Sequence, residues 1–571
     1  MRDEISIRIA GEAGQGMQTI GIALCKSLKN AGYYIFSNMD YMSRIRGGNN
    51  FFQIRISNRP IHTLREKADI IIPLNKESIV LHKDSLTKGG ILILDKEKFN
   101  PKDNNSKFFN VPFYKMAQDT GGSEIFINSV TSGLIAGILR LEFSYTEEIL
   151  KSIFHNKDKE VIETNIKAAK SGYAFAKSNF KKDSFTVKKC GKTKDHFILN
   201  GNEAIGLGAI YAGCKFYSAY PMSPSTGIMN LVAHYAEKLN IVVEQAEDEI
   251  AAINMIIGAS FAGARAMTST SGGGFALMHE GISLAAMTET PVVIANAQRP
   301  APATGFPTRT EQGDLDFLIH SGHGEFAKVV YTPGTIEEAF YLTMKAFDIA
   351  EKYQVPVLIL TDQHLADSNR NIDPANLKII KIERHIISKS ASKDIKEYKR
   401  YKLTKSGISP RAIPSWIDGV IYADSDEHTE SGHITEDGAI RVKMVEKRLH
   451  KKMALLKKDT EKLKTHNLDN AHTVIIGFGS TYGALNDFSQ LRESKKFGII
   501  HIPQVWPFPS EELDQKLKKT KRIITIENNA GAQLAKLIKR ETGLTVDKTI
   551  LKFDGRPFNL DILLDEVSKE A

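Results

Sequence analysis

Cysteine is scarce in this chain of 571 residues. The three cysteines, Cys25, Cys190 and Cys214, lie far apart and form no C-x-x-C pair. Such a set cannot by itself hold an iron–sulfur cluster or a structural zinc ion, and it excludes a disulfide framework. The sequence therefore predicts a protein of the reducing cytoplasm that has no metal site of its own.

Targeting and membrane signals are also missing. The N-terminus enters an alternating strand, "EISIRIAG", without a basic-then-apolar leader, so we expect no secretion. The longest apolar region, residues 275–297, is interrupted by His279, Glu280 and Glu289. We therefore expect no membrane-spanning helix.

The positive charge is not concentrated in one part of the chain. The net charge is +9, but lysine and arginine are spread along the whole chain. The densest run, "KRLHKKMALLKKDTEKLK" from Lys447, alternates with apolar residues at helical spacing. This pattern predicts a solvated helix rather than a site for a polyanion, and we expect no nucleic-acid partner.

The chain is too long for one hydrophobic core and predicts several α/β domains. Strand-like runs alternate with helical patterns, which implies parallel sheets covered on both faces. A polar, cationic linker and a charged segment without strands separate these regions. The predicted parts are an N-terminal domain, a linker, a second α/β domain, a charged connecting segment and a C-terminal α/β domain, at residues 1–182, 183–196, 197–370, 371–470 and 471–571.

A glycine loop, "GEAGQG", lies between the first strand and the first helix. Gly11, Gly14 and Gly16 follow G-x-x-G-x-G spacing, which is not the dinucleotide pattern. Such a loop offers backbone N–H groups and a helix N-terminus to an anion. From the residues alone, a ligand site and a tight strand-to-helix turn both remain open. A later loop, "GFGSTYG", is interpreted as a simple connection of that kind.

A proline-braced turn, "SAYPMSPSTG", precedes a cluster of acids in "EQAEDEIAAINM". Pro221 and Pro224 bracket Ser223 and fix the backbone around its hydroxyl. Glu247, Asp248 and Glu249 open a helix of small residues. Acids in a first turn suit the helix dipole without any ligand, but a buried polar cofactor ring also needs a hydroxyl-rich turn and an acid.

A third block contains "NAQRPAPATGFPTRTEQGDL". Arg299 has a planar guanidinium that pairs bidentately with a carboxylate, although a surface ion pair is an equally open interpretation. His428 and His433 lie among acids in "DEHTESGHITED". We interpret that tract as a solvated loop or an interface segment rather than a metal site.

Taken together, these motifs resemble the 2-oxoacid:ferredoxin oxidoreductase family, in the arrangement of an alpha subunit with a gamma-type domain fused ahead of it. "GEAGQG" and "YMSRIRGGNNFFQIRIS", with Arg46, Gly47 and Gly48, resemble the two signatures of the gamma domain. "YPMSPSTG" is similar to the family's Y-P-I-T-P-S, with Met222 and Ser223 at the isoleucine and threonine. "PQVWPFP" and "ENNAGAQLAKLI" resemble C-terminal signatures. The resemblance implies a Rossmann-like gamma domain, a thiamine diphosphate pyrimidine-binding domain and a transketolase C-terminal-like domain.

The resemblance also implies roles for individual residues. Glu249, with Glu247 in reserve, falls where the family hydrogen-bonds N1′ of the aminopyrimidine. Ser223 falls at the hydroxyl that meets the 2-oxo group, and Arg299 and Thr308 at the positions that meet the carboxylate. The full implied set is catalytic Glu249, Ser223, Arg299 and Thr308, and cofactor-binding Tyr220, Pro221, Glu249, Gly11, Gly14 and Gly16.

One half of a thiamine site is missing. The usual mark of the Mg²⁺–diphosphate half is G-D-G followed by paired asparagines, and the chain has no such motif. The resemblance therefore implies a beta subunit that supplies Mg²⁺ and a [4Fe-4S] cluster, in a heterodimer or a dimer of heterodimers. Coenzyme A is the implied co-substrate and ferredoxin the electron acceptor.

The implied reaction is coenzyme A-dependent oxidative decarboxylation of a 2-oxoacid, with 2-oxoglutarate as the first candidate. Pyruvate and branched-chain or aryl 2-oxoacids remain alternatives. A non-catalytic scaffold subunit is the alternative of a different class. Gly273 in place of proline, and Ala301 and Ala303 in place of glycine and serine, depart from the family pattern.

Overall fold

The computed structural model of the chain describes residues 2–43, 47–100, 107–181, 184–393, 395–469 and 471–570. Arg46 of the second glycine signature and the start of the predicted linker lie outside these residues. The chain forms two compact units. The N-terminal unit comprises Met1–Leu199, Asp367–Asn376 and Asn559–Ala571, and the large unit comprises Asn200–Ala366 and Leu377–Phe558. The predicted domain limits stay predictions.

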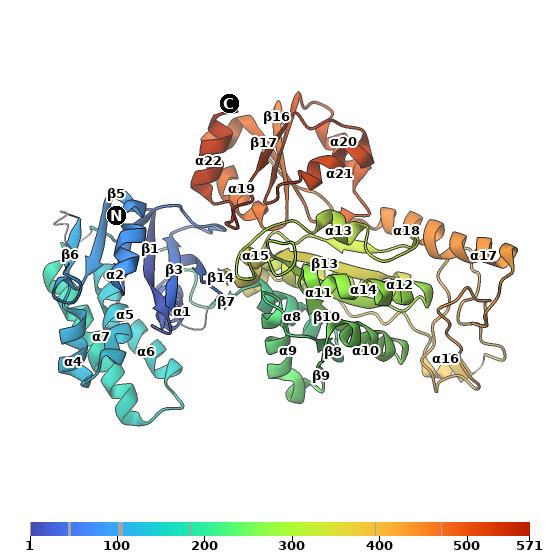
Figure 1. Cartoon of the computed structure of the whole chain (residues 1–571), viewed down its shortest axis with the longest axis horizontal. Coiled ribbons are helices and arrows are strands. Elements are labelled where there is room, and N and C mark those ends of the chain that lie inside the picture. The colour runs from blue at the N-terminus through green and yellow to red at the C-terminus, as the bar shows by residue number, and fades with distance from the viewer. Residues whose placement is uncertain are drawn as a thin grey trace. The chain divides into compact units, whose positions relative to one another are not determined.

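The N-terminal unit is built on an eight-stranded sheet in the order β6-β5-β4-β1-β3-β2-β14-β7 (Figure 1). Its central strand β1 has the apolar residues Ile5, Ile7 and Ile9 fully buried. The strands are β1 (Glu4–Ala13), β2 (Tyr34–Asp40), β3 (Gly47–Ser57), β4 (Ala68–Pro73), β5 (Leu86–Leu94), β6 (Phe108–Asn110), β7 (Phe197–Leu199) and β14 (Asn369–Ile372).

This sheet is mixed, so the prediction of a wholly parallel sheet is wrong for this unit. Strands β1, β4, β5 and β6 are parallel, whereas β3 pairs antiparallel with both β1 and β2. The reason lies in the connection between β2 and β3, which is too short for the crossover that parallel neighbours need. Strands β14 and β7 extend the antiparallel half.

Helices cover this sheet, and one helix pair approaches unusually closely. A Cβ at Gly133 of α5 would lie 1.8 Å from the carbonyl oxygen of Ala169 in α7, so the two backbones meet where only glycine fits. The helices are α1 (Met17–Asn30), α2 (Lys76–His82), α3 (Lys96–Phe99), α4 (Phe113–Gly121), α5 (Ile127–Ile138), α6 (Phe143–Ile153), α7 (Lys159–Asn179) and the C-terminal α22 (Leu560–Ser568).

The large unit contains a seven-stranded sheet in the order β18-β12-β13-β11-β10-β8-β9. All pairs are parallel except β12 with β18, which is the predicted doubly covered α/β arrangement. Its inner strands β11 and β13 are buried along their whole length. The strands are β8 (Phe216–Ala219), β9 (Val242–Gln245), β10 (Ala266–Thr270), β11 (Val292–Gln298), β12 (Val329–Tyr331), β13 (Pro356–Asp362) and β18 (Gln504–Trp506).

The helices of this part follow the strands in alternation (Figure 1). They are α8 (Gly201–Tyr211), α9 (Thr226–Leu239), α10 (Glu249–Phe261), α11 (Gly272–Leu277), α12 (His279–Met287), α13 (Leu315–Ile319), α14 (Ile336–Tyr353), α15 (Gln363–Asp367) and α16 (Lys389–Lys393).

A smaller sheet in the order β15-β17-β16-β19-β20 completes the large unit. We call residues 471–558 the C-terminal lobe. β15 (Lys464–His466) precedes the lobe and pairs with its edge strand β17. The remaining strands and helices around this sheet are β16 (Thr473–Phe478), β17 (Phe497–Ile502), β19 (Arg522–Glu527), β20 (Lys548–Leu551), α19 (Thr481–Ser489), α20 (Ser510–Leu517) and α21 (Gln533–Thr542). The multidomain α/β fold class predicted from the sequence is confirmed.

The connecting segment corrects three predictions. It is not free of strands, because it contributes β14 and β15. The basic run forms α17 (Gly438–Val445), a π-helical turn (Glu446–Lys451) and α18 (Lys452–Lys458), and it is not a solvated helix. Lys447 and Lys452 are buried because both pair with the buried carboxylate of Glu289. His428, expected in a solvated loop or an interface segment, is fully buried against the ring of Tyr401, so the solvated loop is wrong at this residue.

Candidate functional site

The predicted site residues of the large unit follow the carboxyl ends of neighbouring parallel strands. Tyr220 comes directly after β8, Glu249 soon after β9, and Arg299 directly after β11. Ligands of open parallel sheets bind at this edge, where the strands end and the loops and helix N-termini begin. The topology therefore brings these segments, far apart in sequence, to one edge of one sheet.

The structure separates the three acids before α10. Asp248 is the N-cap, and its Oδ1 accepts a hydrogen bond from the N–H of Ala251 at 2.7 Å. Glu247 is exposed. Glu249 is buried, with 3% of its surface exposed. Helix capping therefore accounts for Asp248 but not for Glu249, whose burial needs another reason.

The carboxylate of Glu249 is only partly satisfied. Its Oε1 is buried and has no hydrogen-bond partner among the residues that the structure describes. Burial raises the pKa of Glu249, and the neighbouring Asp248 adds to the rise, against opposing hydrogen bonds that include one from Thr270. A buried acid with an unpaired oxygen is a strong candidate for contact with a ligand.

Gly274 makes room for this carboxylate. A Cβ at Gly274 would lie 2.3 Å from Oε1 of Glu249 and 2.1 Å from Oγ1 of Thr270, the last residue of β10. Both distances are far below van der Waals contact, so any side chain here would displace the acid or the hydroxyl. Sequence reasoning singled out neither Gly274 nor Thr270, although both lie in the glycine-rich stretch "TSTSGGG".

The proline-braced turn presents its first residues to solvent. Tyr220 is 41% exposed, and Ser223 is also exposed. Beneath them, the buried Ser225 donates a hydrogen bond to the carbonyl of Met222 at 2.8 Å. The side-chain amide of Asn202 donates to the carbonyl of Pro224 at 2.9 Å. The turn is therefore held from below, and its outer face is free to contact a ligand or another chain.

Arg299 joins this turn directly. Its Nη1 donates a hydrogen bond to the carbonyl oxygen of Ser223 at 2.7 Å. Burial lowers the pKa of Arg299, and Asp314 acts in the opposite direction. Two predicted site residues, 76 positions apart, thus meet at the same edge.

Asp314 and Asn296 form a buried pair beside Arg299 that sequence reasoning missed. The side-chain amide of Asn296 donates to Oδ2 of Asp314 at 3.0 Å. Burial raises the pKa of Asp314, while Asn296 and Arg299 oppose the rise. The sequence feature that could have revealed this pair is Asn296 itself, a polar residue inside the fully buried strand "VVIANAQ".

Thr308 does not contact the other predicted site residues through a hydrogen bond in the described part of the chain. It lies partly exposed in the loop that follows Arg299. Within the described residues, no hydrogen bond joins it to Arg299, Ser223 or Glu249. Its proposed role therefore depends on the path of the loop, not on a contact.

The glycine loop belongs to the N-terminal unit and is described there by itself. Gly14 and Gly16 have φ of 92° and 73°, in the region that favours glycine. A Cβ at Gly16 would lie 2.1 Å from Nδ2 of Asn128, whereas nothing approaches within 4 Å of one at Gly14. A cavity of about 220 Å³ adjoins the loop, lined by Gly14, Gln15, Phe113, Tyr114 and Asn128, among others. Gly11 is part of β1.

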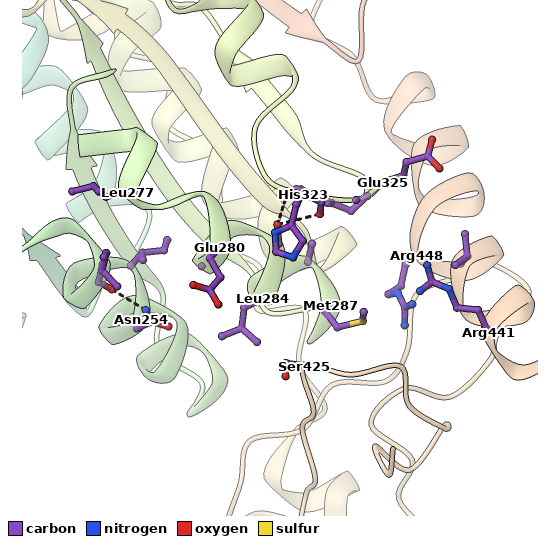
Figure 2. A pocket seen from close by; sticks show the side chains of 18 residues that line it. Asn254, Leu277, Glu280, Leu284, Met287, His323, Glu325, Ser425, Arg441 and Arg448 are labelled. Carbon is purple, nitrogen blue, oxygen red and sulfur yellow. Dashed lines mark hydrogen bonds between the residues drawn. The ribbon is translucent and has the colours of Figure 1, made fainter. Parts of the chain in front are cut away.

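A larger groove runs along the same helix that begins with Glu249. It has a volume of about 790 Å³ and is lined by residues of α10, α12 and residues 441–448. Figure 2 shows Glu280, Leu284 and Met287 on one wall and Arg441 and Arg448 on the other. Leu277, which also lines the groove, is 49% exposed. This mixture of apolar and charged side chains is typical of a protein-binding surface.

Comparison with known families covers most of the chain. The family model described as "Pyruvate flavodoxin/ferredoxin oxidoreductase, thiamine diP-bdg" matches residues 207–447. "Pyruvate ferredoxin/flavodoxin oxidoreductase" matches residues 6–175, and "Pyruvate:ferredoxin oxidoreductase core domain II" matches residues 471–561.

Individual relatives agree with these matches. The chain is 36% identical to the 2-oxoacid:ferredoxin oxidoreductase subunit alpha of Sulfolobus sp, over 98% of this chain and 96% of that protein. It is 30% identical to the 2-oxoglutarate synthase subunit KorA of Methanothermobacter thermautotrophicus, over 66% of this chain and 99% of that protein.

A solved structure matches over the full length. The 2-oxoglutarate:ferredoxin oxidoreductase from Magnetococcus marinus, with 2-oxoglutarate, coenzyme A and succinyl-CoA bound, superposes with a TM-score of 0.91 and 31% identity, covering 100% of both chains. With sequence identity and fold in agreement over its whole length, the chain belongs to the alpha subunits of the 2-oxoacid:ferredoxin oxidoreductase family.

Proposed function

We propose that this subunit carries the pyrimidine half of a thiamine diphosphate site for coenzyme A-dependent oxidative decarboxylation of a 2-oxoacid, with 2-oxoglutarate as the first substrate to test. The observation that carries the proposal is Glu249, a buried acid with an unpaired oxygen at the carboxyl edge of a parallel sheet. The choice of 2-oxoglutarate is supported by relatives named for that acid. Pyruvate and branched-chain or aryl acids are the competing substrates.

The residues present fit the cofactor. When bound, thiamine diphosphate supplies the carbanion that attacks the 2-oxo carbon and the ring that accepts the electrons of the broken bond. Glu249 would hold a proton at N1′ of the aminopyrimidine, because its unpaired Oε1 needs a hydrogen-bonding partner and burial raises its pKa. Tyr220 and Pro221 would flank the same ring.

The substrate would lie between the proline-braced turn and the loop after β11. Ser223 is exposed, so its hydroxyl can face the 2-oxo oxygen. Arg299 uses Nη1 to bind the carbonyl of Ser223, and its remaining N–H groups can meet the substrate carboxylate. We assign the second carboxylate contact to Thr308.

A beta subunit would complete the site with Mg²⁺, the diphosphate-binding residues and a [4Fe-4S] cluster, and ferredoxin would take the electrons. The absence of G-D-G with downstream asparagines supports this division. The groove along α10 is lined by Ile250, the residue after Glu249, and we assign it to the beta subunit that completes the site. We propose a heterodimer or a dimer of heterodimers, and the cytoplasm as its location, which the free cysteines support.

The glycine loop of the N-terminal unit would take part in binding coenzyme A. Gly11, Gly14 and Gly16 lie before the N-terminus of α1, where backbone N–H groups favour phosphate. The adjoining cavity, with Phe113 and Tyr114 in its wall, offers aromatic surface for a ring. The open position of Gly14 leaves the approach clear.

The test is anaerobic co-expression with the beta subunit, followed by 2-oxoacid- and coenzyme A-dependent reduction of a viologen dye. The substrates are 2-oxoglutarate, pyruvate and 2-oxoisovalerate, and each subunit alone is the control. We expect turnover only in the mixture, fastest with 2-oxoglutarate. A thiamine-loaded complex that turns over none of these acids would contradict the proposed reaction and favour a scaffold.

A further inference from the structure

Residues 299–316 form a strap that leaves the end of β11 and crosses to the C-terminal lobe. The strap begins with Arg299 and carries Thr308, the two residues proposed to hold the substrate carboxylate. Its first turn is tight, because Gly305 has a φ of 53° and a Cβ there would lie 1.8 Å from the carbonyl oxygen of Pro300. Only glycine fits this turn.

The downstream half of the strap is fastened by Gln312, which is fully buried. Its backbone N–H donates to the carbonyl of Asn528 at 2.7 Å, and its Oε1 accepts from the N–H of Asn528 at 3.0 Å. Its Nε2 donates to the carbonyl of Phe478 at 2.8 Å. Gln312 is therefore bonded on both backbone and side chain to two loops of the C-terminal lobe.

Asn528, which bonds Gln312, also bonds a third loop of the lobe. It is 1% exposed, and its Nδ2 donates to the carbonyls of Lys552 at 2.6 Å and Arg556 at 3.2 Å. The turn between those two residues lies against the strap. Gly555 accepts a hydrogen bond from the N–H of Thr310 at 3.4 Å, and a Cβ on Gly555 would lie 3.3 Å from Cβ of Arg309.

Gln533 holds the far end of the strap. Its Nε2 donates to the carbonyl of Gly313 at 2.8 Å, and its Oε1 accepts from the N–H of Asp316 at 3.0 Å. Asn528 therefore bonds Gln312 itself, and Gln533 bonds the strap on the downstream side of Gln312. The bonds from Gln533 are made to backbone atoms, which fixes the path of the strap rather than one side chain.

The fastening ends next to Thr308. Two residues on, the hydroxyl of Thr310 accepts from the N–H of His364 at 3.2 Å and bonds Oδ1 of Asp362 at 3.4 Å. At the other end, Arg299 is bonded to the carbonyl of Ser223. Thr308 itself has no such bond within the described residues, so its position depends on these anchors.

We propose that the C-terminal lobe positions the carboxylate-binding strap, and that Asn528 and Gln533 are the positioning residues through which it acts. The inference rests on the proposed function, since it assumes that Arg299 and Thr308 meet the substrate. It gives the lobe a part in substrate binding that requires no contact between its residues and the substrate. Removing the hydrogen bonds that hold the strap should weaken binding of the 2-oxoacid more than it slows the chemical step.

The kinetic test uses Asn528→Leu and Gln533→Leu in the complex with the beta subunit. We expect each to raise the KM for the 2-oxoacid about tenfold, with kcat and the KM for coenzyme A changed by less than about threefold. Gln533→Glu keeps the acceptor for Asp316 and loses the donor to Gly313, so its KM should be intermediate. The matched control is Leu537→Ala, a buried change on the same helix as Gln533 that removes no hydrogen bond to the strap.

A second readout does not depend on turnover. Hydrogen–deuterium exchange of the strap peptide, measured on the whole alpha chain, should be faster in Asn528→Leu and Gln533→Leu than in Leu537→Ala at matched loss of Tm. Equal exchange in all three variants, or a KM that rises equally in the control, would overturn the inference.

The two proposals fail separately. If the wild-type complex turns over no 2-oxoacid, the proposed function fails, and the exchange experiment still decides whether the lobe holds the strap. If turnover is normal but the Asn528 and Gln533 variants keep the wild-type KM, the inference fails and the proposed function stands.

Discussion

Lys447 and Glu289 form an ion pair in which both side chains are fully removed from solvent. Lys452 binds the second carboxylate oxygen at 2.6 Å, and Arg400 donates to the backbone carbonyl of Glu289 at 2.7 Å. Burial by itself raises the pKa of Glu289, but Lys452 and Lys447 outweigh that effect and hold the pKa well below its usual range. Glu289 thereby helps to fix the connecting segment to the core of the large unit.

Replacing this acid should be costly. Glu289→Ala leaves two buried ammonium groups without their partner, and we expect a loss of about 3–5 kcal/mol in the free energy of unfolding, measured by denaturant titration. The contribution of Glu289 is present above the carboxylate pKa of the unfolded chain, about 4, and is lost as the pH falls below it. The exposed Glu280→Ala is the control and should change stability by less than about 0.5 kcal/mol. Equal stability of the two variants would contradict this account.

The ion pair of Lys447 and Glu289 shows which structural features local sequence patterns cannot predict. The helical spacing of the basic run predicts a solvated helix because that spacing is a local signal, whereas the acid that Lys447 binds lies 158 residues away. Local patterns did recover the strand–helix alternation, the proline-braced turn and the acids before α10. They could not reveal Asn296, Gly274 or Asn528, whose roles come from contacts between distant segments. Nor could alternation alone show that β3 pairs antiparallel with β1.

Lys328 is a buried cation that has no acidic partner within the described part of the chain. Its ammonium donates to the carbonyl of Ser321, and burial lowers the pKa of Lys328 to about 7. Between pH 7 and about 10.4, Lys328 binds fewer protons in the folded state than in the unfolded state. The buried charge therefore destabilises the folded state most below pH 7, and this destabilisation decreases as the pH rises. Lys328→Met should therefore stabilise the chain by about 2 kcal/mol at pH 6–7 and by much less at pH 10.

Thermal unfolding across this pH range tests the prediction for Lys328. Lys345→Met is a suitable comparison, because Lys345 is paired with Glu461 and its replacement should destabilise the chain instead. A stabilisation by Lys328→Met that does not change with pH would show that packing, not charge, is responsible.

Asp561 anchors the C-terminal helix α22 to the N-terminal unit. Its Oδ1 accepts from Nη2 of Arg65 at 2.6 Å, and its Oδ2 accepts from the N–H of Glu66 at 2.7 Å. Burial tends to raise the pKa of Asp561, but the hydrogen bonds and charge of Arg65 outweigh it and lower that pKa. The anchor is therefore strong at neutral pH and weakens as the pH falls below about 4.

Asp561→Asn should release this helix. We expect a loss of about 1–2 kcal/mol at pH 7, seen as faster hydrogen exchange in residues 559–570 and in β1 and β3, with little change at pH 3. Asp565→Asn, on the same helix, is the matched control. Unchanged exchange in Asp561→Asn would mean that the apolar face of α22 holds it without the ion pair.

Glu249 combines a predicted role in the reaction with a cost in stability. Glu249→Gln should lower the turnover of the complex by about 100-fold or more, because the amide cannot hold the proton at N1′. The same change should raise the Tm of the alpha chain alone, since burial raises the pKa of this acid and so disfavours its charged form. The gain should grow as the pH rises from 4 to 8, because burial disfavours the charged form of the acid. Glu247→Gln, on an exposed side chain, should change neither quantity.

Gly274→Ala tests the same acid without altering its chemistry. The added Cβ would lie 2.3 Å from Oε1 of Glu249, so the carboxylate must move away from its place above β10. We expect turnover to fall about tenfold or more while the chain keeps its fold, as seen by circular dichroism. Gly273→Ala is the matched control, because nothing lies within 4 Å of a Cβ at that position. If both alanine variants keep full turnover, the placement of Glu249 at the reacting centre is wrong.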